Sequence, residues 1–218
     1  MAKIRVLIAD DEMLVRRALS IFLENDEMTV VGNAENGLDA VEKARSLRPD
    51  VVVMDLQMPT MNGVEAIARI TTQWPQIRVI AVTTFGTTDA VLPALRAGAS
   101  GYLLKDTDPD DIVAAVRGIH AGNGVLSPQV TGKLIASIKG APQPEVRGLA
   151  EHEEPTDRER ETLEMLATGK SNAEIARAMN VSEGTVKAHL SSLMSKWNVR
   201  DRVQLLIRAA RAGLVSFE

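Results

Sequence analysis

The 218-residue sequence contains no cysteine, which excludes disulfide bonds, thiol redox chemistry and cysteine-based zinc sites. It has no apolar run approaching the roughly eighteen residues that a membrane-spanning helix needs, and no signal-peptide pattern stands at its beginning. We therefore expect a cytoplasmic protein with no membrane partner. With 45% hydrophobic residues, the chain can bury one medium-sized core and one smaller core.

An excess of positive charge is also absent, because the net charge is −4. The charges are nevertheless distributed unevenly along the chain. Residues 165–213 hold eight basic and three acidic side chains, whereas residues 1–139 hold fourteen basic and seventeen acidic ones. A locally basic C-terminal segment is typical of a domain that binds a polyanion such as nucleic acid.

The first half of the chain alternates short apolar runs with segments of helical periodicity. This alternation predicts an α/β fold with a doubly wound, five-stranded parallel sheet. Proline in the fourth helix, Pro93, should remove one backbone hydrogen bond and kink that helix, either for a functional reason or as a tolerated irregularity. The predicted strands include Ile4–Ala9, Val51–Met54, Ile77–Val82 and Tyr102–Leu104. The predicted helices are Leu14–Leu23, Leu38–Leu47, Val64–Ile70, Thr88–Ala97 and Asp110–His120.

Polar side chains follow these strands at their C-terminal ends: Asp10, Asp11, Asp55, Thr83 and Lys105. In an open parallel sheet the strand C-termini converge on one crevice, where ligands bind. Three carboxylates would repel one another there unless a divalent cation such as Mg²⁺ neutralised them, and a lysine and a threonine beside it can hold phosphoryl oxygens. Strands often end in polar residues simply because such residues are solvated at the sheet edge, and this would account for any one of these positions. It does not readily account for all of them together.

These residues resemble the receiver domain of bacterial response regulators over about residues 3–122. The match consists of the Asp10-Asp11 pair, the segment DLQMPTMNG that begins at Asp55, a threonine pair that begins at Thr83, and Tyr102 three residues before Lys105. The resemblance implies that a sensor histidine kinase phosphorylates Asp55.

The same resemblance assigns the other site residues. It implies that Asp11, Asp55 and the backbone carbonyl of Gln57 ligate Mg²⁺, with Asp10 acting through water. It further implies that Thr83 and Lys105 bind the acyl phosphate and that Tyr102 is an aromatic rotamer switch.

Two enzyme classes fit the sequence poorly. A phosphatase of the haloacid dehalogenase type needs an acid two residues after its aspartate nucleophile, and Gln57 cannot serve as one. A nucleotide-binding enzyme would need a glycine-rich turn after the first strand, whereas the Asp-Asp-Glu found there would repel phosphates. Apart from self-phosphorylation and self-dephosphorylation at Asp55, we expect no enzymatic activity.

The sequence in the middle of the chain indicates a connection between two domains. Ser127-Pro128 predicts the start of a short helix that ends near Ile138. Residues 139–155 are rich in glycine, proline and acidic side chains and show no apolar periodicity, which indicates a linker. We therefore predict domains at residues 1–125 and 156–218, joined by a short helix and flexible linker at residues 126–155.

The last sixty or so residues have the pattern of a small all-α domain. Thr156 with Glu159 forms a capping-box spacing, and Asn172, Ser182 and Asp201 are the expected caps of three further helices. The third helix carries an apolar stripe of Val186, Leu190, Leu193 and Trp197, which leaves Lys187, Ala188, Ser191, Ser192 and Ser195 facing outward. This arrangement is typical of a helix-turn-helix whose second helix enters the major groove, although a helical bundle used for protein contacts has a similar pattern.

The sequence of residues 156–213 closely resembles the LuxR-type DNA-binding domain, and together with the receiver it is similar to NarL/FixJ-class transcriptional response regulators. The resemblance implies binding to double-stranded promoter DNA. It suggests that Lys187 and Ala188 meet base edges and that the residues contacting phosphates are Thr185, Lys196 and Arg200. Ser191, another candidate contact, occupies a position that is basic in some relatives. Trp197 occupies a position that usually holds a smaller aliphatic residue, and we expect it to enlarge the hydrophobic core.

The combined reading is a DNA-binding regulator switched by Mg²⁺-dependent phosphorylation, which favours a homodimer. Leu205 and Ala209 should lie off the inward stripe of the last helix, free to pair across a two-fold axis. A rival hypothesis is a receiver that acts through protein contacts, with a tail that only dimerises.

The acyl phosphate on Asp55 should be long-lived. Neither Gln57 nor Phe85 can serve as a general base for its hydrolysis, and the Phe85 ring can exclude the attacking water. The alternative is that this ring packs on its own loop and leaves the access of water unchanged.

Overall fold

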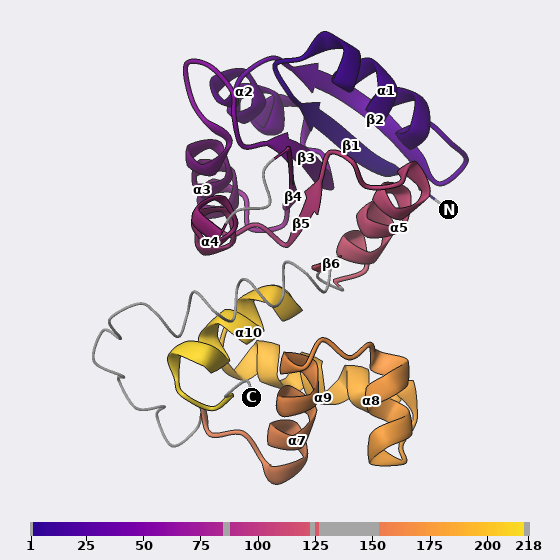
Figure 1. Cartoon of the computed structure of the whole chain (residues 1–218), viewed down its shortest axis with the longest axis vertical. Coiled ribbons are helices and arrows are strands. Elements are labelled where there is room, and N and C mark those ends of the chain that lie inside the picture. Colours follow the sequence, from indigo (N-terminus) through magenta and orange to yellow (C-terminus); the bar gives the residue numbers. More distant parts are fainter. Residues whose placement is uncertain (1, 85–87, 123–124, 127–152, 216–218) are drawn as a thin grey trace. The chain divides into compact units, whose positions relative to one another are not determined.

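The computed structural model of the protein describes residues 2–84, 88–122, 125–126 and 153–215. The chain divides into two compact units, Met1–Val130 and Thr131–Glu218 (Figure 1). Among the described residues, none of the helices combines the length and the apolar character needed to cross a bilayer.

The first unit contains a parallel sheet with the strand order β2-β1-β3-β4-β5-β6. The predicted α/β class is confirmed, and the structure adds the two-residue strand β6, which the sequence pattern did not indicate. In chain order the elements are β1 (Ile4–Ala9), α1 (Met13–Leu23), β2 (Met28–Ala34), α2 (Gly37–Leu47), β3 (Val51–Asp55), α3 (Gly63–Gln73), β4 (Arg78–Thr83), α4 (Thr88–Arg96), β5 (Gly101–Leu104), α5 (Pro109–His120) and β6 (Val125–Leu126).

The sheet is doubly wound, with helices on both of its faces (Figure 1). Helices α1 and α5 contact each other on one face, while α3 contacts both α2 and α4 on the other. The first face is closed by a core of aliphatic residues that alternate along the strands, such as Val6, Ile8, Val51 and Val53, packed against the two helices. The buried strands hold the sheet rigid, so the strand ends have fixed positions.

Local sequence explains where several of these helices begin. Asn36 and Asn62 accept hydrogen bonds from the third backbone N–H that follows, and Asp108 accepts one from Asp110 with proline at the first helical position. Helix α4 contains Pro93, as expected, and the predicted kink there stays a prediction.

The described part of the second unit is a helical bundle of α7 (Asp157–Ala167), α8 (Asn172–Met179), α9 (Glu183–Lys196) and α10 (Arg202–Arg211). The capping box at Thr156 and Glu159 is confirmed, as are the caps at Ser182 and Asp201. The predicted cap at Asn172 is wrong, because Ser171 caps α8 and forms a second capping box with Glu174. Asn180 adopts the left-handed conformation that turns the chain between α8 and α9.

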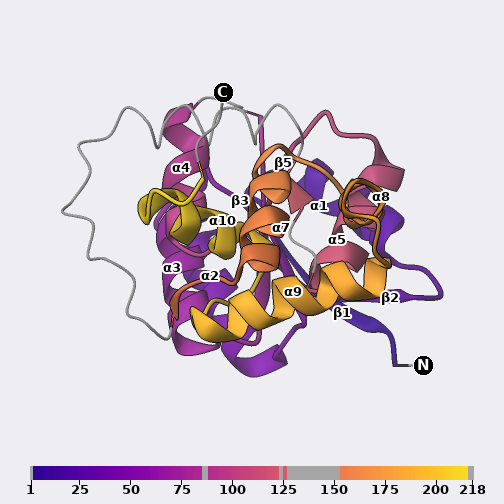
Figure 2. The ribbon, with the colours of Figure 1, turned by 90° about the horizontal axis from the view of Figure 1, so that it is seen from below.

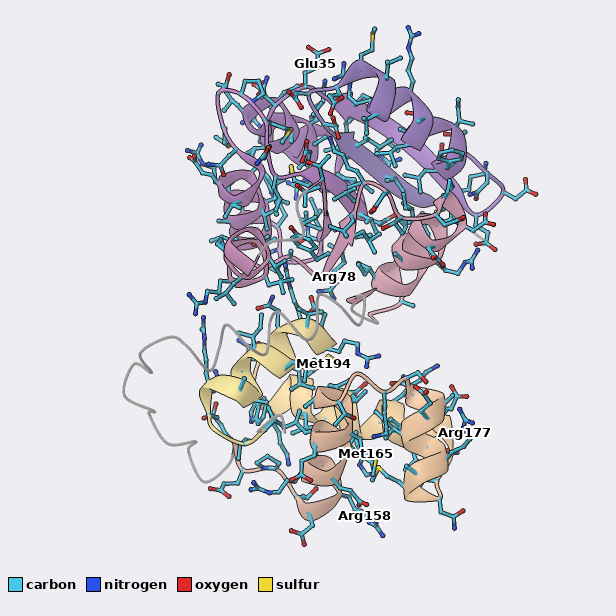
Figure 3. All side chains as sticks on the ribbon, viewed as in Figure 1. Glu35, Arg78, Arg158, Met165, Arg177 and Met194 are labelled. Atoms are coloured by element: carbon cyan, nitrogen blue, oxygen red, sulfur yellow. The ribbon has the colours of Figure 1, made fainter. Side chains whose placement is uncertain are left out.

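The core of this bundle contains the predicted stripe of α9, since Val186, Leu190, Leu193 and Trp197 are all buried. Partly buried methionines from α7 and α9, labelled in Figure 3, pack against this core.

The predicted role of Leu205 and Ala209 is wrong: both side chains have no exposed surface and belong to the core of their own unit. The last helix is covered on more than one face, so these two residues are not free to pair with a second copy.

Several predictions fall on residues outside the described ranges. They are the short helix that begins at Ser127-Pro128, most of the linker at 139–155, and the position of Phe85.

Candidate functional site

The C-terminal edge of the sheet brings together the polar residues that the sequence singled out. Asp10 directly follows β1, Asp55 is the last residue of β3, Thr83 is the last residue of β4, and Lys105 directly follows β5. These strands are neighbours in the sheet, and their parallel direction places all four residues at one edge. Asp10, Asp55 and Thr83 are buried, whereas Asp11 is exposed.

Lys105 is the cation at the centre of this cluster. Its Nζ lies 2.8 Å from Asp10 Oδ2 and 2.9 Å from Asp55 Oδ2. A carboxylate oxygen from each of Asp10, Asp11 and Asp55 lies within 4.8 Å of the other two, which is close enough for one metal ion to contact all three. One ammonium group therefore faces more negative charge than it can neutralise.

Two residues that sequence reasoning missed also contribute to this edge. Glu12 Oε1 lies 3.3 Å from Lys105 Nζ, and the Glu12 N–H donates to Asp10 Oδ1 over 2.9 Å. Arg16, on α1, donates to the backbone carbonyls of Asp10 and Asp11. Arg16 shares the inward stripe of α1 with Leu19 and Leu23, and a cation on an apolar stripe was the signal available in the sequence.

The electrostatics of the cluster follow from burial and pairing. Burial raises the pKa of the Asp10 carboxyl above its usual value, although Lys105 and the Glu12 N–H favour its charged form. Burial works to lower the pKa of Lys105, but its hydrogen bonds to Asp10 and Asp55 outweigh this effect and hold that pKa above its usual value, so the ammonium stays charged. Burial of Tyr102, together with the nearby Asp55 charge, raises the tyrosine pKa to about 12.

The loop after β3 is held tightly against Asp55. The Gln57 N–H donates to Asp55 Oδ1 over 3.2 Å, and the Gly63 N–H donates to the Leu56 carbonyl over 3.0 Å. A Cβ atom on Gly63 would lie 2.0 Å from the carbonyl oxygen of Asp55, so only glycine fits there. The Gln57 side chain is exposed, and its backbone is positioned by Asp55.

The donor set fits a hard divalent cation such as Mg²⁺. The three clustered carboxylates supply only oxygen, Asp11 is open to solvent, and the negative charge exceeds what Lys105 neutralises. Mg²⁺ is usually held by one or two carboxylates together with waters and phosphate oxygens, which matches this half-open arrangement.

The second unit presents a polar helix face, on α9, shown lengthwise in Figure 2. The predicted outward residues Lys187, Ala188, Ser191, Ser192 and Ser195 are all exposed, as the amphipathic pattern indicated. Thr185 is half-buried in the first turn, where its N–H donates to the Ser182 side chain. Helix α8 precedes α9 across a tight turn and contacts it, so the pair forms a helix-turn-helix.

Two of the predicted phosphate contacts are engaged within their own unit. Lys196 Nζ lies 2.6 Å from Oε2 of the buried Glu159, and Arg200 Nε lies 3.6 Å from Asp201 Oδ2. Burial works to raise the pKa of Glu159, but hydrogen bonds from Lys196, Ser192 and Thr156 lower it to about 2. Glu159 therefore links the start of α7 to the end of α9.

Residues just before α7 are attached to the same end of α9. The Trp197 indole Nε1 donates to the Glu153 carbonyl over 2.8 Å, and Lys196 Nζ donates to the Glu154 carbonyl over 3.4 Å. The Glu153 carboxylate also pairs with Arg208 of α10, whose guanidinium lies 6.0 Å from the centre of the Trp197 ring. Trp197 is thus both core, as predicted, and a hydrogen-bond donor.

Comparisons with known families and proteins agree with this geometry. Residues 6–117 match the family described as response regulator receiver domain, and residues 156–209 match bacterial regulatory proteins of the luxR family. The transcriptional regulatory protein LnrK of Bacillus subtilis is 42% identical over 98% of this chain and 100% of its own length. The response regulator protein VraR of Staphylococcus epidermidis is 39% identical over 97% of this chain and 99% of its own.

Solved structures give the same result. The response regulator ChrA of a heme-sensing two-component system is 32% identical, with a TM-score of 0.53, over 98% of this chain and 100% of its own. The signal receiver domain of a putative response regulator NarL from Mycobacterium tuberculosis is 33% identical, with a TM-score of 0.55, over 56% of this chain and 100% of its own.

A receiver implies a histidine kinase partner, and a LuxR-type domain implies binding to DNA. The matches cover both units and nearly the whole chain. The protein belongs to the two-component response regulators that join a receiver to a LuxR-type helix-turn-helix and regulate transcription.

Proposed function

We propose that this regulator is switched by Mg²⁺-dependent phosphorylation of Asp55, and that the phosphorylated chain dimerises and binds promoter DNA. The observation that carries the proposal is the position of Asp55. Its carboxylate lies at the C-terminal end of β3, 2.9 Å from the Lys105 ammonium and within metal-sharing distance of Asp10 and Asp11. The loop that follows Asp55 is held against it through the Gln57 N–H and the close approach of Gly63.

The chemistry is transfer of a phosphoryl group from a phosphohistidine of the sensor kinase to an oxygen of Asp55. A P–O bond forms to the carboxylate as the P–N bond breaks, and the electron pair of the broken bond stays on the imidazole nitrogen of the kinase. A divalent cation held by Asp11, Asp55 and the Gln57 carbonyl, with Asp10 acting through water, would stabilise negative charge on the phosphoryl oxygens.

Lys105 and Thr83 complete the proposed site. In the structure the Lys105 ammonium is shared between Asp10 and Asp55, so it is close enough to Asp55 to donate to an oxygen of a phosphoryl group on that residue. Because the pKa of Lys105 is raised, its charge is present throughout the physiological pH range. Thr83 ends the neighbouring strand, from which its hydroxyl can donate to a second phosphoryl oxygen. Tyr102 is buried on β5, two strands away from Asp55 in the sheet. We propose that its side chain changes rotamer when the Thr83 hydroxyl donates to the phosphoryl group.

In the second unit we propose that α9 enters the major groove of DNA. Lys187 and Ala188 are the candidates for base contacts and Ser191 is a further contact, since all three are exposed on one face. Thr185, Lys196 and Arg200 are the proposed phosphate contacts. The last two already pair with acidic side chains, so we expect them to contribute less to DNA affinity than the exposed Lys187 does.

Dimerisation would present two such helices to two half-sites, as the geometry of helix-turn-helix proteins requires. The buried positions of Leu205 and Ala209 mean that the pairing surface must use other residues. If the tail only dimerised, DNA affinity would be weak and would not fall steeply with salt concentration, because few phosphates would be neutralised.

The phosphoacceptor is tested by intact-mass measurement after incubation with acetyl phosphate, with and without Mg²⁺. We expect one added phosphate in the wild type with Mg²⁺ only, and none in Asp55→Asn. Asp26→Asn, which changes an exposed aspartate away from the sheet edge, is the matched control and should label like the wild type. Full labelling of Asp55→Asn would reject the assignment.

A further inference from the structure

Arg16 occupies an unusual place for a cation. It lies on the inward face of α1, and only 11% of its side chain is exposed, among residues that otherwise close the core. Its neighbour Arg17, on the same helix, is exposed. A buried arginine loses hydration, so its hydrogen bonds must compensate for that loss.

The partners of Arg16 are backbone carbonyls of the acidic loop. Its Nη1 donates to the carbonyl of Asp10 over 2.8 Å and to the carbonyl of Asp11 over 3.0 Å. Its Nη2 pairs with Glu35 Oε1 over 2.8 Å, and Glu35 itself is exposed at the edge of the unit, where Figure 3 labels it. The Asp10 N–H also donates to the carbonyl of Ala34, the last residue of β2, over 3.1 Å. The backbone of the Asp10-Asp11 segment is therefore held both by α1 and by the end of β2.

These contacts differ in kind from those of Lys105. Lys105 pairs with the carboxylates of Asp10 and Asp55, so a cation entering the site must share those oxygens with it. Within this loop Arg16 contacts the backbone carbonyls of Asp10 and Asp11. It therefore does not compete with a metal ion for the carboxylate oxygens of these two residues. Its guanidinium reaches two carbonyls and a carboxylate through the nitrogens of one rigid planar fork. The donors of an ammonium group rotate freely and do not impose such a fixed geometry.

We propose that Arg16 is a positioning residue for the divalent cation, oriented by Glu35. It fixes the Asp10-Asp11 backbone so that these mutually repelling carboxylates stay within reach of one ion. The role rests on the cation site of the proposed function. Residues that orient metal ligands typically change metal affinity by 10–100-fold when they are replaced.

The test measures binding of Mn²⁺ or Mg²⁺ alone by calorimetry, on the full chain without a phosphoryl donor. We expect Arg16→Met to bind the ion about 10–100-fold more weakly than the wild type, and Arg16→Lys to fall between them. Arg17→Met removes an equal charge from the same helix and should bind within about twofold of the wild type. Circular dichroism and urea unfolding establish that each variant is folded at the temperature used.

A second readout separates positioning from general stability. The Glu12 N–H, hydrogen-bonded to Asp10 Oδ1, should exchange its hydrogen faster in Arg16→Met, while amides in the centre of the sheet keep their protection. If Arg16→Met does not fold, Arg16→Lys and Glu35→Gln decide, and both should weaken ion binding by several-fold.

The outcomes distinguish this role from the proposed function. Folded Arg16 variants that bind the ion as tightly as the wild type would overturn the positioning role alone. A wild-type protein that binds neither Mn²⁺ nor Mg²⁺ would overturn the cation site itself, and the positioning role with it.

Discussion

Replacing Glu159 with glutamine should destabilise the DNA-binding unit, and the size of the effect can be worked from the structure. Glu159 Oε2 accepts hydrogen bonds from Lys196 Nζ over 2.6 Å and from the Thr156 N–H over 2.8 Å, and its side chain is 5% exposed. Glutamine keeps the shape and one acceptor oxygen, so the helix cap can persist. The substitution removes the negative charge that compensates Lys196.

The magnitude follows from the pKa. The folded state lowers the pKa of Glu159 from 4.5 to about 2, and each pKa unit corresponds to about 1.4 kcal/mol, which sets an upper limit of about 3 kcal/mol. Because 27% of the Lys196 side chain is exposed, solvent screens the pair, and we expect a loss of about 2 kcal/mol at pH 7. A lowered folded-state pKa stabilises the fold above about pH 4.5, and this stabilisation disappears as the pH falls toward 2.

Urea unfolding followed by Trp197 fluorescence measures this loss in the relevant unit. The other tryptophan, Trp74, is in the receiver, so all proteins carry Trp74→Phe. Glu164→Gln, which removes an exposed charge from the same helix, is the control and should change stability by less than about 0.5 kcal/mol. Equal losses in both variants, or a Glu159→Gln deficit that stays constant from pH 7 to pH 3, would show that the charge of Glu159 does not stabilise this unit.

Three other substitutions test separate parts of the account. Lys187→Ala should weaken binding to a specific DNA fragment by about 1–3 kcal/mol at fixed salt, and unchanged affinity would remove α9 from the groove. Gly63→Ala should destabilise the receiver by about 3 kcal/mol in urea unfolding, because its Cβ would overlap the Asp55 carbonyl, and wild-type stability would show that the loop can move. The phosphorylated Phe85→Glu variant should lose its phosphate faster than the phosphorylated wild type under excess Mg²⁺, and equal rates of release would show that this side chain does not set the lifetime.

The polar edge of the receiver could be predicted from the sequence because the parallel sheet leaves little freedom. Once β1, β3, β4 and β5 are neighbours with a common direction, the residues at their ends must meet, as Asp10, Asp55 and Lys105 do. The outward face of α9 was predictable for a similar reason, since a single apolar stripe fixes which side chains face solvent.

The errors arose where tertiary packing decides. Leu205 and Ala209 lie off the first apolar stripe of α10, but apolar residues occur nearly all round this helix, a pattern typical of burial on several faces. The N-cap of α8 could have been either of two adjacent residues, Ser171 or Asn172. Ser171 is the N-cap because it and Glu174 form the reciprocal hydrogen bonds of a capping box. The contacts of Arg16 and Glu159 bring together residues from different elements, so periodicity within one helix could show only that a charged residue occupies a buried position.

The most direct test of the account compares DNA binding before and after phosphorylation. A genomic fragment selected with the phosphorylated protein is titrated at one salt concentration with wild-type chain and with Asp55→Asn, each with and without acetyl phosphate and Mg²⁺. We expect acetyl phosphate and Mg²⁺ to tighten DNA binding by the wild type, with a shift toward dimer in sedimentation, and to leave DNA binding by Asp55→Asn unchanged. Equal affinity of the treated and untreated wild type, or equal tightening in Asp55→Asn, would contradict the proposal that phosphorylation of Asp55 controls DNA binding.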